Sequence, residues 1–555
     1  MDVRPFRFFR NIGRSREIIS VLVRYGFADL VDRLHLRRYL QWGRRLLSFR
    51  KPPPEIRRSR AERIRLSLES LGATFIKFGQ VLSTRPDLVP ADVVAELAQL
   101  QEQVPSFPYD LARDLIRQGL GAEIEDLFAD FDPQPLAAGS LGQVHRARAM
   151  DGTLLAVKIR RPQVVQTVER DLSLMQELAA LIERHIPEAE AFDPVGLVKQ
   201  FARTIRREMN YTREARTMGE FRRLFRNDAT LSVPQVHWDL SCESILSMEF
   251  IDGHRIDEME ELARLGISRA DVAANGAAIF MKQAFELGVF HGDPHPGNIR
   301  VLDDGSICLL DYGMVGAIDD EQRERLIDLF MAIARRDVKR AVELIQKIGE
   351  PFRPIDRTLL QADVRDFVEN YYGLTLDRLN VGNMLSDFVN IMAIHGIRCP
   401  ADLMLLIRAL VTLEGVGRDL DPAFNFAELL APFIERTIRE RYNPTRIAGR
   451  VFSEIQTFAR VAHDMPIHIG RTIEKLSRDE LKIQLEHRRL EHLITEVDRS
   501  SNRVVVSVVM ASLILSSALV MDNGRTGAII AGTVFVLSSM LGIWLIYGVF
   551  RSGRL

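Results

Sequence analysis

The spacing of apolar residues divides the chain into segments with different periods. Between residues 58 and 83, apolar side chains recur at alternating intervals of four and three from Ile64 to Leu82, which predicts helix because an α-helix turns once every 3.6 residues. Prolines at 52–54 predict a boundary before this helix, since proline removes a backbone donor and clashes with the preceding turn. Further helices are predicted over about 91–103 and 109–119 and, in broken form, over 13–50.

After Pro135 the pattern changes to short runs that are typical of β-strands. Residues 141–148 and 154–159 flank the turn Asp151-Gly152, which predicts a β-hairpin. Helices are then predicted over 164–185 and 194–222, and strands over 233–238 and 244–250. Strands mixed with helices in this way indicate a small α+β lobe.

Helical periodicity dominates from residue 254 to about 470, apart from short segments around Asp293 and Asp311. A mostly helical large lobe is therefore expected, joined to the small lobe near Ile251-Asp-Gly253. The predicted division is an arm (1–57), a helical extension (58–131), the small lobe (132–252), the large lobe (253–470), an amphipathic helix (471–503) and a hydrophobic tail (504–550).

The hydrophobic tail has the pattern of a transmembrane hairpin. Residues 504–521 and 527–550 carry no charge, and as helices they would be roughly 27 and 36 Å long, which brackets the hydrocarbon core of a bilayer. Arginines flank both outer ends while the connecting turn holds only Arg525, so both ends are expected on the cytoplasmic side, at the inner membrane in a bacterium. Before the tail, apolar residues from Leu476 to Val497 repeat at sevens and predict a stripe that packs on the body or on a partner.

Composition narrows the class of protein only a little. The chain has 555 residues, of which 46% are hydrophobic and 27% charged, and its net charge of −1 gives no global attraction to nucleic acid. Residues 1–60, however, hold fifteen Arg and one Lys against five acids, which suits an anionic membrane surface or a solvated arm. Three widely spaced cysteines without a C-x-x-C pair favour a reducing compartment. A secretory signal is not expected, while an organellar transit peptide stays open.

Two short segments of the large lobe carry candidate chemistry. His291-Gly-Asp-Pro-His-Pro-Gly-Asn298 gives Asp293 and Asn298 the D-x-x-x-x-N spacing of a kinase catalytic loop, and Asp311-Tyr-Gly313 follows in the place of the D-F-G motif. In such sites the first Asp orients or deprotonates the acceptor, and the Asn and the second Asp hold metal. The pair at this separation predicts a phosphoryl-transfer site.

A lysine in the small lobe fits the same chemistry. Ala156-Val-Lys158 lies in a predicted strand, where a kinase places the lysine that contacts nucleotide phosphates and pairs with a helix glutamate. Glu208 is the favoured partner, and Glu214 is the alternative.

Other motifs make a family resemblance specific. The usual glycine loop is replaced by Pro135-Leu-Ala-Ala-Gly-Ser-Leu-Gly-Gln-Val-His145, and Lys77-Phe-Gly-Gln80 stands in the extension. Together with the A-V-K strand, the 291–298 and 309–313 motifs and the tail, the chain from about residue 60 onward resembles the UbiB/ADCK family of atypical kinase-like proteins.

The resemblance implies an α+β, protein-kinase-like two-lobed fold whose N-terminal extension lies over the cleft. It implies an ATPase that uses Mg2+ and is coupled to lipid handling in isoprenoid-quinone, chiefly ubiquinone, biosynthesis. Membrane lipids or quinone precursors are the expected partners, other quinone-biosynthesis proteins and a homodimer stay open, and nucleic acid is not expected. The implied site has Lys158 on phosphates, Glu208 holding it, Asn298 and Asp311 on magnesium, Asp293 near the reacting phosphoryl group, nucleotide contacts from Ala137, Ala138, Gly139, Ser140 and Glu249, and Lys77 and Gln80 facing it from the extension.

Two positions depart from the family pattern. The family's E-x-D reads Glu208-Met-Asn210 here, which weakens a metal or Lys77-pairing role at 210. Gly139 stands where Ala is common, which predicts more kinase-like nucleotide handling because the backbone is freer and no Cβ crowds the phosphates.

Two other functions are compatible with these motifs. His291-Gly-Asp293 with Asn298 also resembles the catalytic loop of aminoglycoside phosphotransferases, so a small-molecule or lipid phosphotransferase is one alternative. A non-catalytic, nucleotide-gated scaffold that uses the 476–497 stripe is the other.

Overall fold

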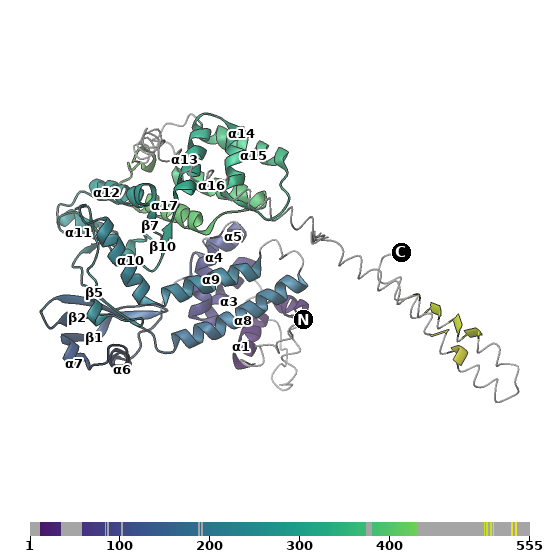
Figure 1. The fold of residues 1–555 in the computed structure, drawn as a ribbon, viewed down its shortest axis with the longest axis horizontal. Coiled ribbons are helices and arrows are strands. Elements are labelled where there is room, and N and C mark those ends of the chain that lie inside the picture. The colour runs from purple at the N-terminus through teal and green to yellow at the C-terminus, as the bar shows by residue number, and fades with distance from the viewer. Residues whose placement is uncertain are drawn as a thin grey trace, which may run out of the picture. The chain divides into compact units, whose positions relative to one another are not determined.

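The protein is described by a computed structural model (Figure 1). It covers residues 12–34, 58–83, 85, 88–100, 104–186, 189, 193–372 and 380–429, and short pieces at 504, 507–508, 511–512, 514–515, 534–536 and 539–540. Two compact units divide between residues 447 and 448. The candidate site lies wholly in the first unit.

The N-terminal arm and the helical extension are built from short helices. They are α1 (Ile12–Arg24), α2 (Ala28–Arg33), α3 (Arg60–Leu71), α4 (Ala73–Ser83), α5 (Ala91–Leu97), α6 (Tyr109–Leu120) and α7 (Ile124–Leu127). The single helix predicted over 58–83 is thus two helices, because Gly72 adopts a φ of +90° between them. At Gly79 the side chain of Leu100 approaches so closely that a Cβ would lie 2.3 Å from it, so glycine permits tight packing of α4 there.

The small lobe holds a four-stranded antiparallel sheet. Its strands are β1 (Phe128–Ala138), β2 (Gly142–Ala149), β3 (Leu154–Arg160) and β5 (Ile245–Glu249), in the order β1-β2-β3-β5. The predicted hairpin is confirmed as β2 and β3, with Val144 opposite Lys158. β1 was not predicted, and it begins inside the segment assigned to the helical extension.

The segment between β3 and β5 differs from the prediction in one helix and in one strand. α8 (Val164–His185) agrees with the prediction, but the helix predicted over 194–222 is two, α9 (Pro194–Glu208) and α10 (Tyr211–Leu224). The side chain of Asn210 accepts a hydrogen bond from the Arg213 amide and caps α10. The strand predicted over 233–238 was wrong in extent, since β4 is Leu231–Ser232 and a 3-10 turn, η6, spans Trp238–Leu240.

Short strands bring the two lobes together. β4 pairs in parallel with β9 (Ile307–Leu309), and β8 (Ile299–Val301) and β6 (His254–Arg255) complete the order β4-β9-β8-β6. β7 (Val289–His291) pairs with β10 (Val315–Ala317), and β11 (Glu350–Pro351) pairs with β12 (Ile397–Arg398). β7 and β9 lead into the two predicted catalytic segments.

The described part of the large lobe, residues 253–372 and 380–429, is mainly helical, as predicted, and Figure 1 shows α13 to α16 grouped around one end of α17. Its helices are α11 (Met259–Arg264), α12 (Arg269–Met281), the π-helical turn η7 (Lys282–Leu287), the 3-10 turn η8 (Pro296–Asn298), α13 (Asp320–Ala334), α14 (Val338–Ile348), α15 (Arg357–Tyr371), α16 (Val381–Ile394) and α17 (Ala401–Leu420). Apolar residues of α12 to α17 form one buried cluster.

Two expectations concern residues that are largely undescribed. The stripe at 476–497 lies outside the described residues, as does most of the tail at 504–550. Within the described residues, no helix combines the length and apolar character needed to cross a bilayer.

Candidate active site

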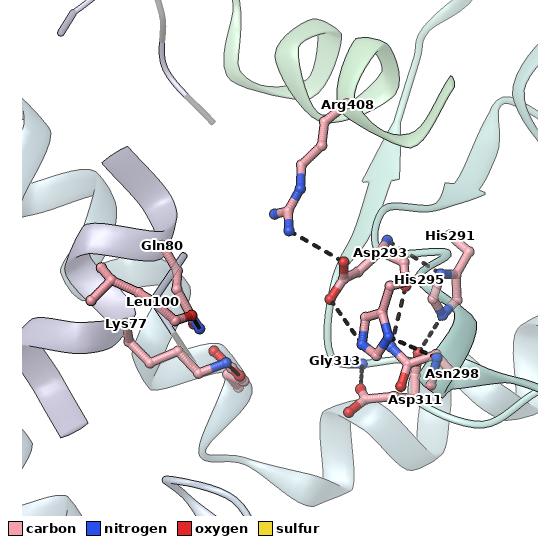
Figure 2. A network of polar contacts seen from close by, with 12 residues as sticks. Lys77, Gln80, Leu100, His291, Asp293, His295, Asn298, Asp311, Gly313 and Arg408 are labelled. Carbon is pink, nitrogen blue, oxygen red and sulfur yellow. Dashed lines mark hydrogen bonds and ion pairs between the residues drawn. The ribbon is translucent and has the colours of Figure 1, made fainter. Parts of the chain in front are cut away.

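Asp293 and Asn298 lie on a loop that is held by hydrogen bonds from its own residues (Figure 2). The Asn298 side-chain amide donates to the Asp293 carbonyl at 3.2 Å, and the Asp293 amide donates to His291 Nδ1 at 3.3 Å. Gln283, in the π-helical turn, accepts from the His291 amide at 3.0 Å. The D-x-x-x-x-N spacing therefore folds into a closed loop with a buried anchor.

Two cationic or polar side chains face the Asp293 carboxylate. Arg408 Nη2 lies 3.4 Å from Oδ1, and His295 Nε2 lies 3.8 Å from Oδ2. Because His295 Nδ1 accepts from the Gly297 amide at 3.0 Å, the neutral ring carries its proton on Nε2. Each carboxylate oxygen thus has a donor on its side.

Asp311 stands beside the same loop. Its Oδ1 accepts from the Gly313 amide at 2.8 Å, and His291 Nε2 donates to its backbone carbonyl. Tyr312 is buried, with its ring 5.1 Å from that of Phe221. The Asp-Tyr-Gly segment is therefore fixed by its buried middle residue, which leaves the Asp311 carboxylate at the edge of the site.

The structure corrects the predicted partner of Lys158. Its Nζ lies 3.0 Å from both carboxylate oxygens of Glu214, in α10, and 3.5 Å from Asp311 Oδ2. Glu208, the favoured candidate, instead pairs with Lys77 at 2.6 Å. The break at Asn210 explains the difference, because it places the two glutamates on separate helices.

Burial and charge act in opposite directions at this cluster. Burial would lower the pKa of Lys158, but the Asp311 and Glu214 carboxylates outweigh it and raise that pKa well above its ordinary value. Burial likewise opposes ionisation of Asp311, yet Lys158 and the Gly313 amide lower its pKa well below the usual range. Lys158 is therefore a cation and Asp311 an anion at neutral pH.

Lys77 and Gln80 both lie on α4, opposite the loop that carries Asp293 (Figure 2). Lys77 reaches Glu208, and its charge contributes to the lowered pKa of Asp311. Gln80 donates to the Leu100 carbonyl at 3.1 Å, which ties α4 to the segment after α5. The extension therefore borders the site through Lys77, while Gln80 fixes the extension to itself.

The loop predicted to cover the phosphates joins β1 to β2. Ala137 and Ala138 pair with Val144 and Gln143 at the end of β1, and the Gly139 amide donates to the Gly142 carbonyl at 2.8 Å. Ser140 follows and is buried. This is a tight turn between paired strands.

Glu249, a predicted site residue, and Asn210, a departure from the family pattern, both make local structural hydrogen bonds. The Glu249 carboxylate accepts from the Gln235 amide at 3.1 Å, at the end of β5. Asn210 caps α10, so the amide that replaces the family carboxylate has a local partner.

Asn298 and Asp311 fit a magnesium site of a particular kind. The described residues contain no group of three or more His, Cys, Asp or Glu side chains placed to hold a metal. Magnesium is usually bound through one or two carboxylates together with substrate phosphates, so one carboxylate and one amide oxygen suffice when the nucleotide supplies the rest.

Several residues of the site were not found from the sequence. Arg408 lies 115 positions beyond Asp293 in a helix with ordinary periodicity, and nothing local marks it. His295 lies inside the His291–Asn298 motif, but the motif assigns it no role. The fold alone brings Arg408 to the loop.

Comparisons with known proteins show what the chain is similar to. Residues 99–345 match the ABC1 atypical kinase-like domain, residues 364–425 the UbiB helical domain, and residues 488–551 the ABC1/UbiB kinase-like C-terminal domain. A probable protein kinase UbiB of Xanthomonas campestris pv. campestris is 31% identical over 96% of this chain and 97% of its own length. An uncharacterised protein of Synechocystis is 32% identical over 87% of this chain and 83% of its own.

A solved structure, titled as the complex of Rv3197 with erythromycin from Mycobacterium tuberculosis, covers 64% of this chain and 90% of its own at 22% identity, with a TM-score of 0.44. The sequence matches confirm the family resemblance drawn from the motifs. The chain belongs to the ABC1/UbiB family of atypical kinase-like proteins.

Proposed function

We propose that the chain is a membrane-anchored, MgATP-dependent ATPase that supports isoprenoid-quinone biosynthesis, with ubiquinone as the favoured product. The observation that carries the enzymatic part is the Lys158–Glu214 pair of 3.0 Å standing 3.5 Å from Asp311. A partly buried lysine held between two carboxylates is the arrangement by which kinases position nucleotide phosphates.

We assign each residue of the site a role in binding ATP and the metal ion. Lys158 binds the phosphates, Glu214 fixes Lys158, and Asn298 and Asp311 hold the metal ion. Magnesium, when bound, would supply the positive charge that neutralises the charge developing on the phosphates. The turn from Ala137 to Ser140 covers the phosphates with backbone groups.

Hydrolysis follows from the position of Asp293. The oxygen of a water attacks the γ-phosphorus while the bond from this phosphorus to the bridging oxygen breaks, and the electron pair stays with ADP. Asp293 orients the water through its carboxylate, and the released proton passes to solvent. We favour water as the acceptor because Lys77 brings the extension to the acceptor side of the site (Figure 2).

The tail supports a place at a bilayer. Its two uncharged runs have the length of membrane spans, and its described positions expose large apolar side chains such as Leu515 at 67% and Met540 at 67%. Quinone precursors dissolve in the bilayer, so an enzyme that handles them gains from anchoring there. The catalytic unit then faces the cytoplasm, because arginines flank the outer ends of the tail.

The test combines turnover with quinone analysis. The full chain in lipid nanodiscs is expected to release phosphate from MgATP, and Asp311→Asn to abolish this. Asp304→Asn is the matched control, since Asp304 caps a turn through Ser306 outside the site. In cells that lack the gene, the parent and Asp304→Asn proteins restore quinone levels, while Lys158→Ala and Asp311→Asn do not.

The outcomes separate the proposal from its two alternatives. Transfer of radiolabel from ATP to a lipid or metabolite would identify a phosphotransferase. Nucleotide binding without turnover, with quinone levels restored by Asp293→Ala, would identify a scaffold. Normal hydrolysis and normal quinone levels with Asp311→Asn would refute the proposed site.

A further inference from the structure

One face of α17 supports the catalytic segments at three successive positions. The helix packs against β10, where the backbone of Ala317 lies close enough to Asp402 to oppose the rise in its pKa that burial causes. Leu405 packs so closely on Gly292 that a Cβ there would lie 2.6 Å from its side chain. Arg408, three residues further and on the same face, reaches Asp293. The helix thus contacts the strand, the loop and the catalytic carboxylate in order.

The helix that presents Arg408 is rigidly placed. α17 has 20 residues, and its opposite side is buried against α12 and α16 through residues such as Leu406 and Leu410. A side chain on a packed helix is positioned more accurately than one on a loop. The packing of α17 therefore determines the side from which the guanidinium approaches Asp293, and Figure 2 shows Arg408 extending from this helix toward the carboxylate.

The contact itself leaves much of Arg408 available. Its side chain is 35% exposed, and among the described residues Asp293 is its only polar partner, through a single contact of 3.4 Å. An arginine that served only to stabilise the fold would be expected to have more of its five N–H donors paired. This one points at the carboxylate that must orient the reacting water.

We propose that Arg408 is a positioning residue of the active site, which holds the Asp293 carboxylate in its productive orientation. The placement of α17 would then affect catalysis directly. The inference rests on the proposed ATPase function and adds a residue to it. Arg408 acts on Oδ1, which leaves Oδ2, beside His295, to accept from the water.

The experiment is a double-mutant cycle on the full chain in nanodiscs. Arg408→Met is expected to lower kcat for MgATP about tenfold and to leave KM within about twofold, because loss of orientation affects the transition state and not ground-state binding. Arg408→Lys should recover at least about a third of the lost rate. In an Asp293→Asn background, Arg408→Met should cost less than about twofold, since both changes remove one function.

Arg418→Met is the matched control. Arg418 lies ten residues further along α17 and pairs with Glu414 at 2.8 Å, outside the site. Its removal takes away the same charge from the same helix, and kcat should stay within about twofold of the parent. Equal losses from Arg408→Met in the parent and Asp293→Asn backgrounds, or equal losses from Arg408→Met and Arg418→Met, would overturn the proposal.

A binding measurement covers the case of slow turnover. Arg408→Met should weaken binding of MgADP with aluminium fluoride, which mimics the transferred phosphoryl group, about tenfold while MgADP alone binds as before. Unchanged binding of the fluoride complex would overturn this inference alone. A parent protein that binds neither MgATP nor MgADP would overturn this inference and the proposed function together.

Discussion

Lys158 is paired with Glu214 and not with Glu208, at 3.0 Å from both oxygens of the Glu214 carboxylate. Glu214 is only 4% exposed, whereas Glu208 is 21% exposed and belongs to Lys77 of the extension. The candidate site therefore contains two lysine–glutamate pairs, Lys158–Glu214 at its centre and Lys77–Glu208 at its border. They should respond differently to the same substitution.

Glu214→Gln is expected to weaken MgATP binding by about tenfold or more and to destabilise the fold by about 2 kcal/mol, because it leaves a partly buried lysine without its closest partner. Glu208→Gln removes a partly exposed pair and should change nucleotide affinity by less than about threefold. Titration with a fluorescent ATP analogue and chemical denaturation measure the two effects. A larger loss of affinity in Glu208→Gln than in Glu214→Gln would mean that Glu208, and not Glu214, supports Lys158 during nucleotide binding.

The sequence located those parts of the site whose spacing is local. Asp293, Asn298 and Asp311 lie within nineteen residues on two loops, so their order along the chain nearly determines their neighbourhood. The hairpin around Lys158 was equally predictable, because its turn and its β-type runs are adjacent.

What could not be predicted depends on breaks and on long-range packing. The pairing of Lys158 was decided by the end of α9 at Glu208 and the cap at Asn210, which a continuous helical pattern concealed. β1 was missed because it contains Pro133 and Pro135, which disfavour strand, and the register shifts near Pro135 show how the sheet accommodates it. Arg408 depended on how α17 packs.

Gly139→Ala tests the departure in the phosphate loop. Gly139 is not among the glycines with positive φ, so alanine can adopt its backbone, and any effect should come from the added Cβ near the phosphates. We expect MgATP affinity to change by about threefold, because the added methyl group alters how the loop accommodates the phosphates. Indistinguishable affinities for the variant and the parent, measured by calorimetry, would show that the loop does not sense this methyl group.

Arg14 and Asp171 join the first helix to the small lobe. Arg14 Nε and Nη2 donate to Asp171 at 2.9 and 3.0 Å, and Asp171 is 1% exposed. Arg14→Met should lower the free energy of unfolding by about 3 kcal/mol, because among the described residues it leaves the buried carboxylate with only the more distant Arg170, at 3.9 Å.

Arg16→Met is the control for this measurement, since Arg16 is exposed on the same helix and its loss should cost less than about 0.5 kcal/mol. Chemical denaturation of the full chain gives both values. Adding Asp171→Asn to Arg14→Met should recover part of the loss; if it deepened the loss, the buried charge would not be its cause.

His145 should make the fold sensitive to acid. Burial lowers its pKa, against a hydrogen bond to the Asp132 carbonyl that favours the charged form. Below about pH 6.5 the unfolded chain binds a proton that the folded chain does not, so stability falls as the pH decreases through this range. Between pH 7.5 and 5.5 this one group contributes at most about 1.4 kcal/mol.

His145→Phe keeps an aromatic ring beside Phe131, whose centroid is 5.1 Å from that of His145, and removes the titrating group. The variant is expected to be less stable at neutral pH, because Gln143 loses a partner, but to lose less stability on acidification than the parent. His291, which burial also affects, is present in both proteins. Parallel pH profiles for the two proteins would assign the acid sensitivity to other groups.

Arg161 connects the phosphate loop to the segment that leads from the extension. Its Nε donates to the Gly139 carbonyl at 2.8 Å and its Nη2 to the Pro105 carbonyl at 2.6 Å, while the guanidinium lies 5.6 Å from the centre of the Phe107 ring. Arg161 therefore links the loop that would close on the phosphates to the helical extension, which also carries Lys77. Arg161→Met should free the loop and raise the dissociation rate of MgATP about tenfold, because it removes two charge-assisted hydrogen bonds.

Arg148→Met provides the comparison, since Arg148 donates to the Gly152 carbonyl at 3.0 Å in the turn at the far end of the same hairpin. Its dissociation rate should match that of the parent in stopped-flow displacement of a fluorescent nucleotide. If both variants release nucleotide at the parent rate, the loop is held by its strand pairing alone, and the extension reaches the nucleotide only through Lys77.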